Sequence, residues 1–254
     1  ARNHPWMTGG LGLALLAVAL LLAAGIRQGL TGGGEPLRLA VLGGLAGFGA
    51  TAVGALAGVT LRRLSQRAED SLLGFAAGMM LAASSFSLIL PGLAAAREMT
   101  GSGPQAALTV VGGMALGVLL MLGLDRFTPH EHESSGPCGP GCERIGRVWL
   151  FVLAITLHNL PEGMAIGVSF AQGDMNVGLP LTSAIAIQDI PEGLAVVMAL
   201  RAAGVGSWPA VLMAGASGLM EPLGSLFGAG IAGGLALAYP VGLGLAAGAM
   251  IFVV

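Results

Sequence analysis

Residues 148–171 read VWLFVLAITLHNLPEGMAIGVSFA, an apolar run that carries His158, Asn159 and Glu162 near its centre. A helix needs about 20 predominantly apolar residues to cross the roughly 30 Å hydrocarbon core of a bilayer. This stretch is long enough to cross, and its polar residues would lie at the depth where polar groups are costly and usually functional. It therefore predicts a membrane-spanning helix with a functional centre.

The same pattern recurs on the next helix along the chain. Residues 158–163 read HNLPEG and residues 188–193 read QDIPEG, and on a third apolar stretch Glu221 precedes a proline. The clusters lie about 10 to 14 residues into their spans, which at 1.5 Å per residue is roughly 15–21 Å from the helix end. The three clusters should therefore share one depth near the middle of the membrane.

The composition agrees with a membrane protein. Charged residues make up 9% of the 254-residue chain, against roughly 25% in soluble domains, and hydrophobic residues make up 55%. The mean hydropathy is +0.85. A net charge of −2 excludes a basic nucleic-acid surface, and two cysteines cannot form a disulfide framework. We predict an all-α, polytopic transmembrane helical bundle.

Eight stretches are long and apolar enough to cross a bilayer. They are 8–26, 37–60, 72–93, 105–123, 148–171, 178–200, 209–232 and 236–254. We expect one transmembrane domain over residues 1–254, with 8–26 as an extra N-terminal helix. The last stretch has no polar flank, so we also expect a C-terminal part to be missing after Val254.

Arginines indicate the orientation in the membrane. When alternate loops are assigned to alternate sides, eight arginines fall on one side and three on the other. Cytoplasmic loops carry the excess of basic residues, so the N-terminus and the loop 124–147 should face the cytoplasm. We expect an integral protein of the cell (inner) membrane.

The loop 124–147 is the only long polar connection, and its proline and glycine content predicts flexibility. It contains four residues of the types that bind transition metals: His130, His132, Cys138 and Cys142. Their spacing is no closed four-ligand zinc pattern. The loop either holds a metal transiently or is simply solvated.

The central carboxylates lack basic partners. No Arg or Lys lies between Arg147 and Arg201, or between Arg201 and Val254. An ionised residue in the middle of a membrane helix costs roughly 2.5–3.5 kcal/mol, so four carboxylates require compensation. Protons or a bound cation must supply it.

Helical spacing gathers these polar residues on one face of each helix. His158 and Glu162 are four residues apart, as are Gln188 and Glu192, so each pair shares a face. The prolines at 161 and 191 free backbone carbonyl groups nearby. If the polar faces of these two helices lie opposite each other, they would form a pocket of imidazole, amide and carboxylate groups.

Small residues also recur four apart within the spans, which allows helices to approach closely. The pairs are Gly43/Gly47, Gly54/Gly58, Gly224/Gly228, Gly230/Gly234 and Gly244/Gly248.

Residues 37–254 resemble the ZIP (Zrt/Irt-like protein) family of divalent-metal transporters. The resemblance rests on the two hexamers 158–163 and 188–193 and on the His-bearing loop before them. The resemblance implies a bundle of eight helices, often dimeric, with a two-metal site in the middle of the membrane. It also implies that the helices near 37–60, 148–171, 178–200 and 209–232 move as a block.

The resemblance further implies two ligand sets. One ion would be held by an imidazole, two carboxylates and a thioether, from His158, Glu162, Glu192 and Met80. The other would be held by amide and carboxylate groups, from Asn159, Gln188, Asp189 and Glu221, with Glu192 shared between both ions.

We therefore expect a metal importer rather than an enzyme, with no prosthetic group and with two bound ions as cargo. The ligand chemistry suits Zn²⁺ and tolerates Cd²⁺, Fe²⁺ or Mn²⁺. A proton or alkali-cation transporter is the alternative, because buried carboxylates serve those ions too. An intramembrane metalloenzyme would need a motif such as H-E-x-x-H, which the chain lacks. Partners would be the metal ions, the bilayer and a second copy of the chain.

Overall fold

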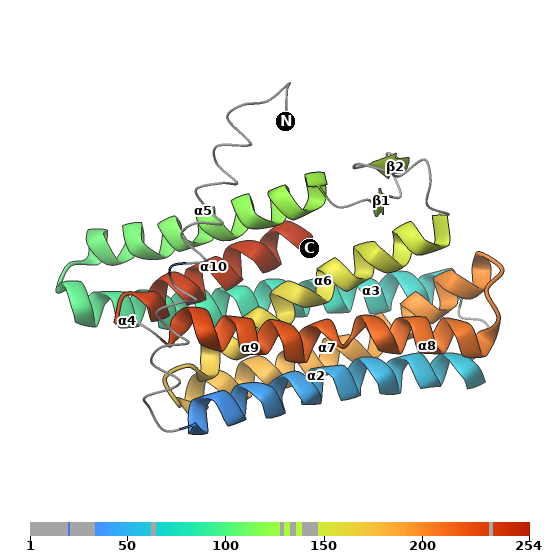
Figure 1. The fold of residues 1–254 in the computed structure, drawn as a ribbon, viewed down its shortest axis with the longest axis horizontal. Coiled ribbons are helices and arrows are strands. Elements are labelled where there is room, and N and C mark those ends of the chain that lie inside the picture. Colours follow the sequence, from blue (N-terminus) through green and yellow to red (C-terminus); the bar gives the residue numbers. More distant parts are fainter. Residues whose placement is uncertain are drawn as a thin grey trace.

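The computed structural model describes residue 20 and residues 34–61, 65–127, 130–132, 136–138, 147–233 and 236–254. Within these residues the chain forms a bundle of long helices that run side by side (Figure 1). The helices are α2 (Glu35–Thr60), α3 (Gln66–Ala82), α4 (Leu90–Thr100), α5 (Gly103–Phe127), α6 (Arg147–Phe170), α7 (Met175–Ala202), α8 (Ser207–Ser217), α9 (Met220–Ala232) and α10 (Ala238–Val253).

Six segments are long and apolar enough to cross a membrane. They are Glu35–Thr60, Asp70–Thr100, Gly103–Asp125, Val148–Phe170, Met175–Ala202 and Ser207–Ala232, and the shorter apolar helix Ala238–Val253 follows them. Six of the eight predicted spans are therefore confirmed, and the predicted stretch 236–254 forms an apolar helix of 16 residues that is shorter than these six. The predicted helix 8–26 lies outside the described residues, except for Leu20.

The second span contains a π-helical segment, η1 (Ala83–Ile89), between α3 and α4. Its last turn is closed by the Leu90 amide, which donates to the carbonyl of Ser85, five residues back. Pro91 follows directly and has no N–H to continue a regular ladder. The wide turn joins α3 and α4 into one crossing segment of 31 residues.

The span predicted at 209–232 consists of two helices, α8 and α9, which follow one another along one line (Figure 1). Pro222 cannot donate to the carbonyl of Gly218, and that carbonyl accepts the Glu221 amide at 3.0 Å instead. The interruption places Glu221 in the first turn of α9. By contrast, α6 and α7 continue through Pro161 and Pro191.

Glycines set the closest helix contacts, as the small-residue spacing predicts. A Cβ at Gly54 would meet the Ile190 backbone, so α2 and α7 touch there. Gly228 likewise lies against the backbone of Met164, where α9 meets α6, and Gly244 against Val110, where α10 meets α5. The pairs α2–α7, α6–α9 and α5–α10 therefore pack backbone to backbone. Gly234 lies outside the described residues.

Between α5 and α6 the described residues include a short antiparallel pair, β1 (His130–His132) and β2 (Gly136–Cys138). His130 is opposite Cys138 in its register. Cys142 lies outside the described residues, so both alternatives for this loop, transient metal binding and simple solvation, stay open.

Candidate metal centre

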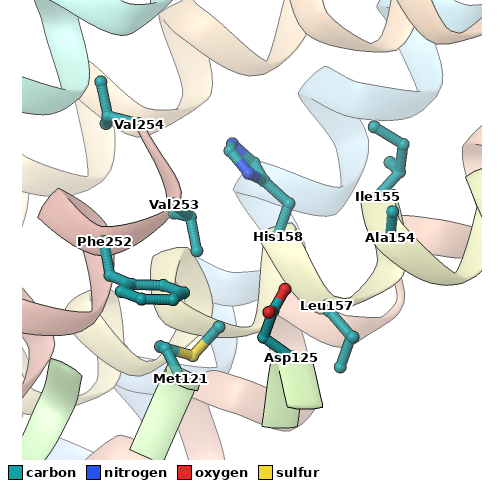
Figure 2. A pocket seen from close by; sticks show the side chains of 9 residues that line it. All are labelled: Met121, Asp125, Ala154, Ile155, Leu157, His158, Phe252, Val253 and Val254. Atoms are coloured by element: carbon teal, nitrogen blue, oxygen red, sulfur yellow. The ribbon is translucent and has the colours of Figure 1, made fainter. Parts of the chain in front are cut away.

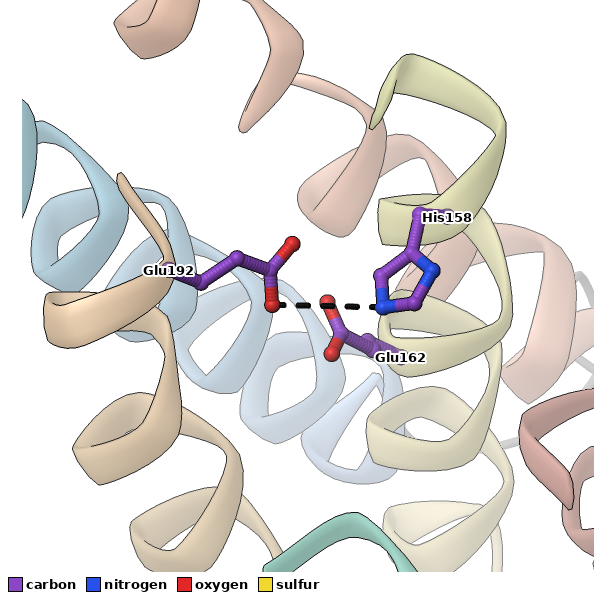
Figure 3. Close-up of side chains that lie close together, drawn as sticks. All are labelled: His158, Glu162 and Glu192. Carbon is purple, nitrogen blue, oxygen red and sulfur yellow. Dashed lines mark ion pairs between the residues drawn. The ribbon is translucent and has the colours of Figure 1, made fainter. Parts of the chain in front are cut away.

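Three of the predicted ligands lie together where α6 faces α7. One ligand atom from each of His158, Glu162 and Glu192 falls within 4.8 Å of the others (Figure 3). His158 Nε2 is 4.0 Å from Glu192 Oε2. His158 and Glu162 come from successive turns of α6, and Glu192 reaches them from α7. The group can accept a small cation with one nitrogen and two oxygen ligands.

Glu162 also connects the two hexamers. Its carboxylate is 1% exposed, and its Oε1 accepts a hydrogen bond from Gln188 Nε2 on α7. The side-chain oxygens Glu162 Oε2 and Gln188 Oε1 have no partner within the described part of the chain. Each residue therefore keeps one oxygen for a further ligand.

A second acidic group lies where α2, α7 and α9 meet. Asp189 and Glu221 are 1% and 0% exposed, and one carboxyl oxygen of each lies beside Gly47 of α2. Thr51 on α2 donates its hydroxyl to Glu221 Oε1 at 2.7 Å. Two carboxyl groups from different helices thus meet in a buried position without a basic residue.

Unpartnered oxygens distinguish this region from the rest of the core. The described residues contain seven buried side-chain oxygens or hydroxyls that lack a hydrogen-bond partner, and five belong to the predicted ligands. They are Asn159 Oδ1, Glu162 Oε2, Gln188 Oε1, Asp189 Oδ2 and Glu221 Oε2. A buried acceptor without a partner costs about 1–3 kcal/mol. Oxygen acceptors from three helices are what a divalent cation would satisfy.

The last glycine of each hexamer brings in the other helices. A Cβ at Gly163 would lie 2.7 Å from Glu221 Cα, so α9 touches α6 at the acidic residue itself. A Cβ at Gly193 would lie against the Thr51 backbone, so α2 touches α7 in the same way. The two glycines therefore allow the helices that carry Glu221 and Thr51 to approach the centre closely. The sequence alone did not indicate this role.

Met80 lies on α3 and is 2% exposed. It belongs to an apolar cluster that includes Ala83, Ile166 and Ile185. Its place among the ligands therefore stays a prediction from the family resemblance, as does the bridging role of Glu192.

A cavity of about 380 Å³ lies beside His158 and is lined by residues of α5, α6 and the end of α10 (Figure 2). Asp125 on α5 lines it together with Met121 and the last residues of α10. Sequence reasoning missed Asp125, because a charge at the end of an apolar span is indistinguishable from an ordinary loop residue. The cavity therefore adjoins the centre at His158.

Comparison with known proteins gives consistent relatives. A family model described as "ZIP Zinc transporter" matches residues 127–254. The zinc transporter ZIPB of Bordetella bronchiseptica is 66% identical over the whole chain and 82% of its own length. The zinc transporter GufA of Myxococcus xanthus is 40% identical, with 81% of each protein covered. The zinc transporter ZupT of Shigella dysenteriae is 37% identical over 75% of this chain and 71% of its own length.

Proposed function

The chain belongs to the ZIP family of zinc transporters, and from that membership we propose that it carries divalent transition-metal ions, Zn²⁺ first, toward the cytoplasm. It is an integral membrane protein, with six helices able to cross a bilayer in its described part. We assign it a transport function and no enzymatic one.

The observation that carries the proposal is the set of unpartnered oxygens beside an imidazole. Five buried oxygens from α6, α7 and α9 lack partners among the described residues, and His158 adds a nitrogen ligand. Helix-borne carboxylates without basic neighbours need positive charge from elsewhere. A transported dication supplies that charge while it is bound.

We propose that two ions occupy this centre. The first would be held by His158, Glu162 and Glu192, with Met80 as a fourth ligand. The second would be held by the amide and carboxylate groups of Asn159, Gln188, Asp189 and Glu221, with Glu192 shared. Imidazole, carboxylate and thioether ligands form a borderline set that suits Zn²⁺ and also accepts Cd²⁺, Fe²⁺ or Mn²⁺. The absence of thiolates from this set keeps binding moderate, which release requires.

The cavity supports the proposed direction. His158 and Asp125 both line it, and Asp125 lies near the end of α5, at the start of the predicted loop 124–147 that contains Arg126, Arg144 and Arg147. By the distribution of arginines, that end faces the cytoplasm. An ion released from His158 would therefore leave on the cytoplasmic side.

The packing also suits movement of a block of helices. The backbone contacts α2–α7 and α6–α9 involve α2 and the three helices that carry every proposed ligand except Met80, whereas α5 packs on α10. We propose that the first four move together relative to the others, so that the centre faces each side of the membrane in turn.

Metal uptake into vesicles by the purified protein tests the proposal. We expect His158→Ala and Glu162→Ala each to abolish most Zn²⁺ and Cd²⁺ flux, because each removes a ligand that no neighbour replaces. Glu98→Ala, which changes an exposed glutamate on α4, is the matched control and should leave flux unaltered. Unchanged flux in the two site variants would make the assignment wrong.

The proton or alkali-cation alternative rests on the buried pair Asp189 and Glu221, which protons alone could neutralise. Measurements of pH and Na⁺ gradients across vesicles that contain the protein separate the two functions. A pH gradient or Na⁺ gradient that is dissipated by the protein without any divalent metal would favour the alternative.

A further inference from the structure

Helix α2 contributes no ligand to the proposed centre, yet two of its residues touch the acidic pair directly. We propose that Thr51 and Gly47 are positioning residues for the second ion: Thr51 orients the carboxylate of Glu221, and Gly47 leaves the space in which that carboxylate meets Asp189. The inference rests on the proposed function, because it concerns binding of the second transported ion.

The hydrogen bond from Thr51 decides which oxygen of Glu221 is available. The Thr51 hydroxyl lies 2.7 Å from Glu221 Oε1 and 3.3 Å from the Gly47 carbonyl. A hydroxyl has one proton to donate, and the shorter contact to a carboxyl oxygen is the stronger one. Oε1 is therefore engaged, and Oε2 remains without a partner among the described residues.

The free oxygen points to the space beside Gly47. A Cβ at Gly47 would overlap Glu221 Oε2 and would lie 3.3 Å from Asp189 Oδ2. Asp189 Oδ2 is also unpartnered within the described structure. Two unpartnered carboxyl oxygens, from α7 and α9, thus converge beside a glycine of α2, where no side chain fills the space. Gly47 and Thr51 are four residues apart, so both face the pair from one side of α2.

The Thr51 side chain packs against the turn between α8 and α9, and its backbone packs against α7. A Cβ at Gly218, in the turn between α8 and α9, would lie 3.1 Å from Thr51 Cβ and 3.2 Å from its methyl carbon. On the α7 side, Gly193 lies against the Thr51 backbone. A β-branched side chain has few allowed rotamers, and these contacts restrict it further. The hydroxyl is therefore directed at Glu221 by packing rather than by the hydrogen bond alone.

The decisive experiment measures zinc binding by the full chain, with stoichiometry from elemental analysis and affinities from calorimetry. Thr51→Val keeps the shape of the side chain and removes the hydroxyl. We expect it to lower the affinity for the second ion by roughly 10–100-fold, because loss of a residue that hydrogen-bonds to a metal ligand usually has an effect of this size. The first ion, at His158, should keep its affinity. Thr51→Ser restores the hydroxyl and should recover most of the second-site affinity.

Thr182→Val is the matched control. Thr182 is also buried and its hydroxyl has no hydrogen-bond partner in the described residues, so the same substitution there removes no contact to the centre. It should leave both ions unaffected. Gly47→Ala gives a second, independent test, because its methyl group would displace the Glu221 carboxylate. Like Thr51→Val, it should lower the affinity for the second ion.

Each outcome decides the inference. The inference is overturned if Thr51→Val binds two ions with wild-type affinity. It is also overturned if Thr51→Ser and Thr51→Val lose the same amount of affinity for the second ion. If Thr51→Val does not fold, wild-type binding by Gly47→Ala overturns it, and selective loss of the second ion supports it. Failure of the proposed function is distinct: the wild-type protein would then bind no zinc, or His158→Ala would leave binding and uptake unchanged.

Discussion

Gly163→Ala should loosen the contact that brings Glu221 to the centre. Gly163 ends the first hexamer on α6, and the backbone of α9 lies directly against it. A methyl group there would be 2.7 Å from Glu221 Cα and 2.8 Å from Glu221 C, where ordinary carbon contacts are about 3.5–4.0 Å. Because both atoms belong to the backbone, no rotamer change can relieve the overlap, and α9 must retreat by roughly 1 Å.

The displacement sets the expected magnitudes. Overpacking of this kind costs about 1–3 kcal/mol, and the better helix propensity of alanine offsets about 0.5–1 kcal/mol of that cost. The net loss of stability should therefore be at most about 2.5 kcal/mol, small enough for the protein to fold. Moving Glu221 should also weaken zinc binding by roughly 10–100-fold, which is usual when the support of a metal ligand is lost.

Zinc titration of the purified variant, with thermal unfolding in parallel, measures both effects. Gly112→Ala is the matched control, because Gly112 lies in the interior of α5 and a Cβ there has no neighbour within 4 Å. It should keep wild-type affinity and equal or higher stability. Wild-type zinc affinity in Gly163→Ala would refute the argument that this contact positions Glu221.

Two further predictions concern the ions themselves. Glu192→Gln should lower bound zinc by more than the loss of a single ligand would, because Glu192 is proposed to serve both ions; elemental analysis showing unchanged stoichiometry would argue against sharing. In thermal unfolding, Zn²⁺ at 100 times its dissociation constant should stabilise the protein by about 2.7 kcal/mol whereas equal concentrations of Na⁺ should not; protection by Na⁺ alone would favour the alkali-cation alternative.

The spans and the three polar clusters can be predicted from the sequence for a physical reason. The bilayer imposes one length on every crossing helix, so counting residues gives depth as well as boundaries. The i, i+4 spacing then puts His158 and Glu162 on one face, and the structure does bring both to Glu192. The boundaries of a span, the depth of its polar residues and the face they share can be predicted because each depends on the sequence of a single helix.

Contacts between distant segments could not be predicted in the same way. Thr51 is 170 residues from Glu221 in the chain, and a threonine in an apolar helix gives no signal of its partner. The interruption between α8 and α9 was also missed, although Pro222 is its local cause. Prolines 161 and 191 lie in helices that continue, so a proline alone does not tell where a membrane helix is interrupted.

The balance of donors and acceptors leads to a last prediction. In the described structure, Gln188 donates to Glu162 and Thr51 donates to Glu221, while Asp189 and Glu192 receive no N–H or O–H from a neutral side chain. Two donors cannot neutralise four carboxylates, and the membrane segments supply no Arg or Lys beside them. When no metal is bound, protons must therefore occupy part of the centre, since ionised carboxylates in a bilayer are costly.

Zinc binding should then expel protons, because metal ligands bind in their deprotonated form. Adding ZnCl₂ to the purified protein in weakly buffered solution should acidify the medium, and calorimetry in buffers of different ionisation enthalpy should give the number of protons released for each ion. Glu221→Gln removes one ionisable group without removing its side-chain oxygen, and it should release fewer protons. Zinc binding with no proton release and no dependence on pH would mean that some other cation compensates the carboxylates in the empty state.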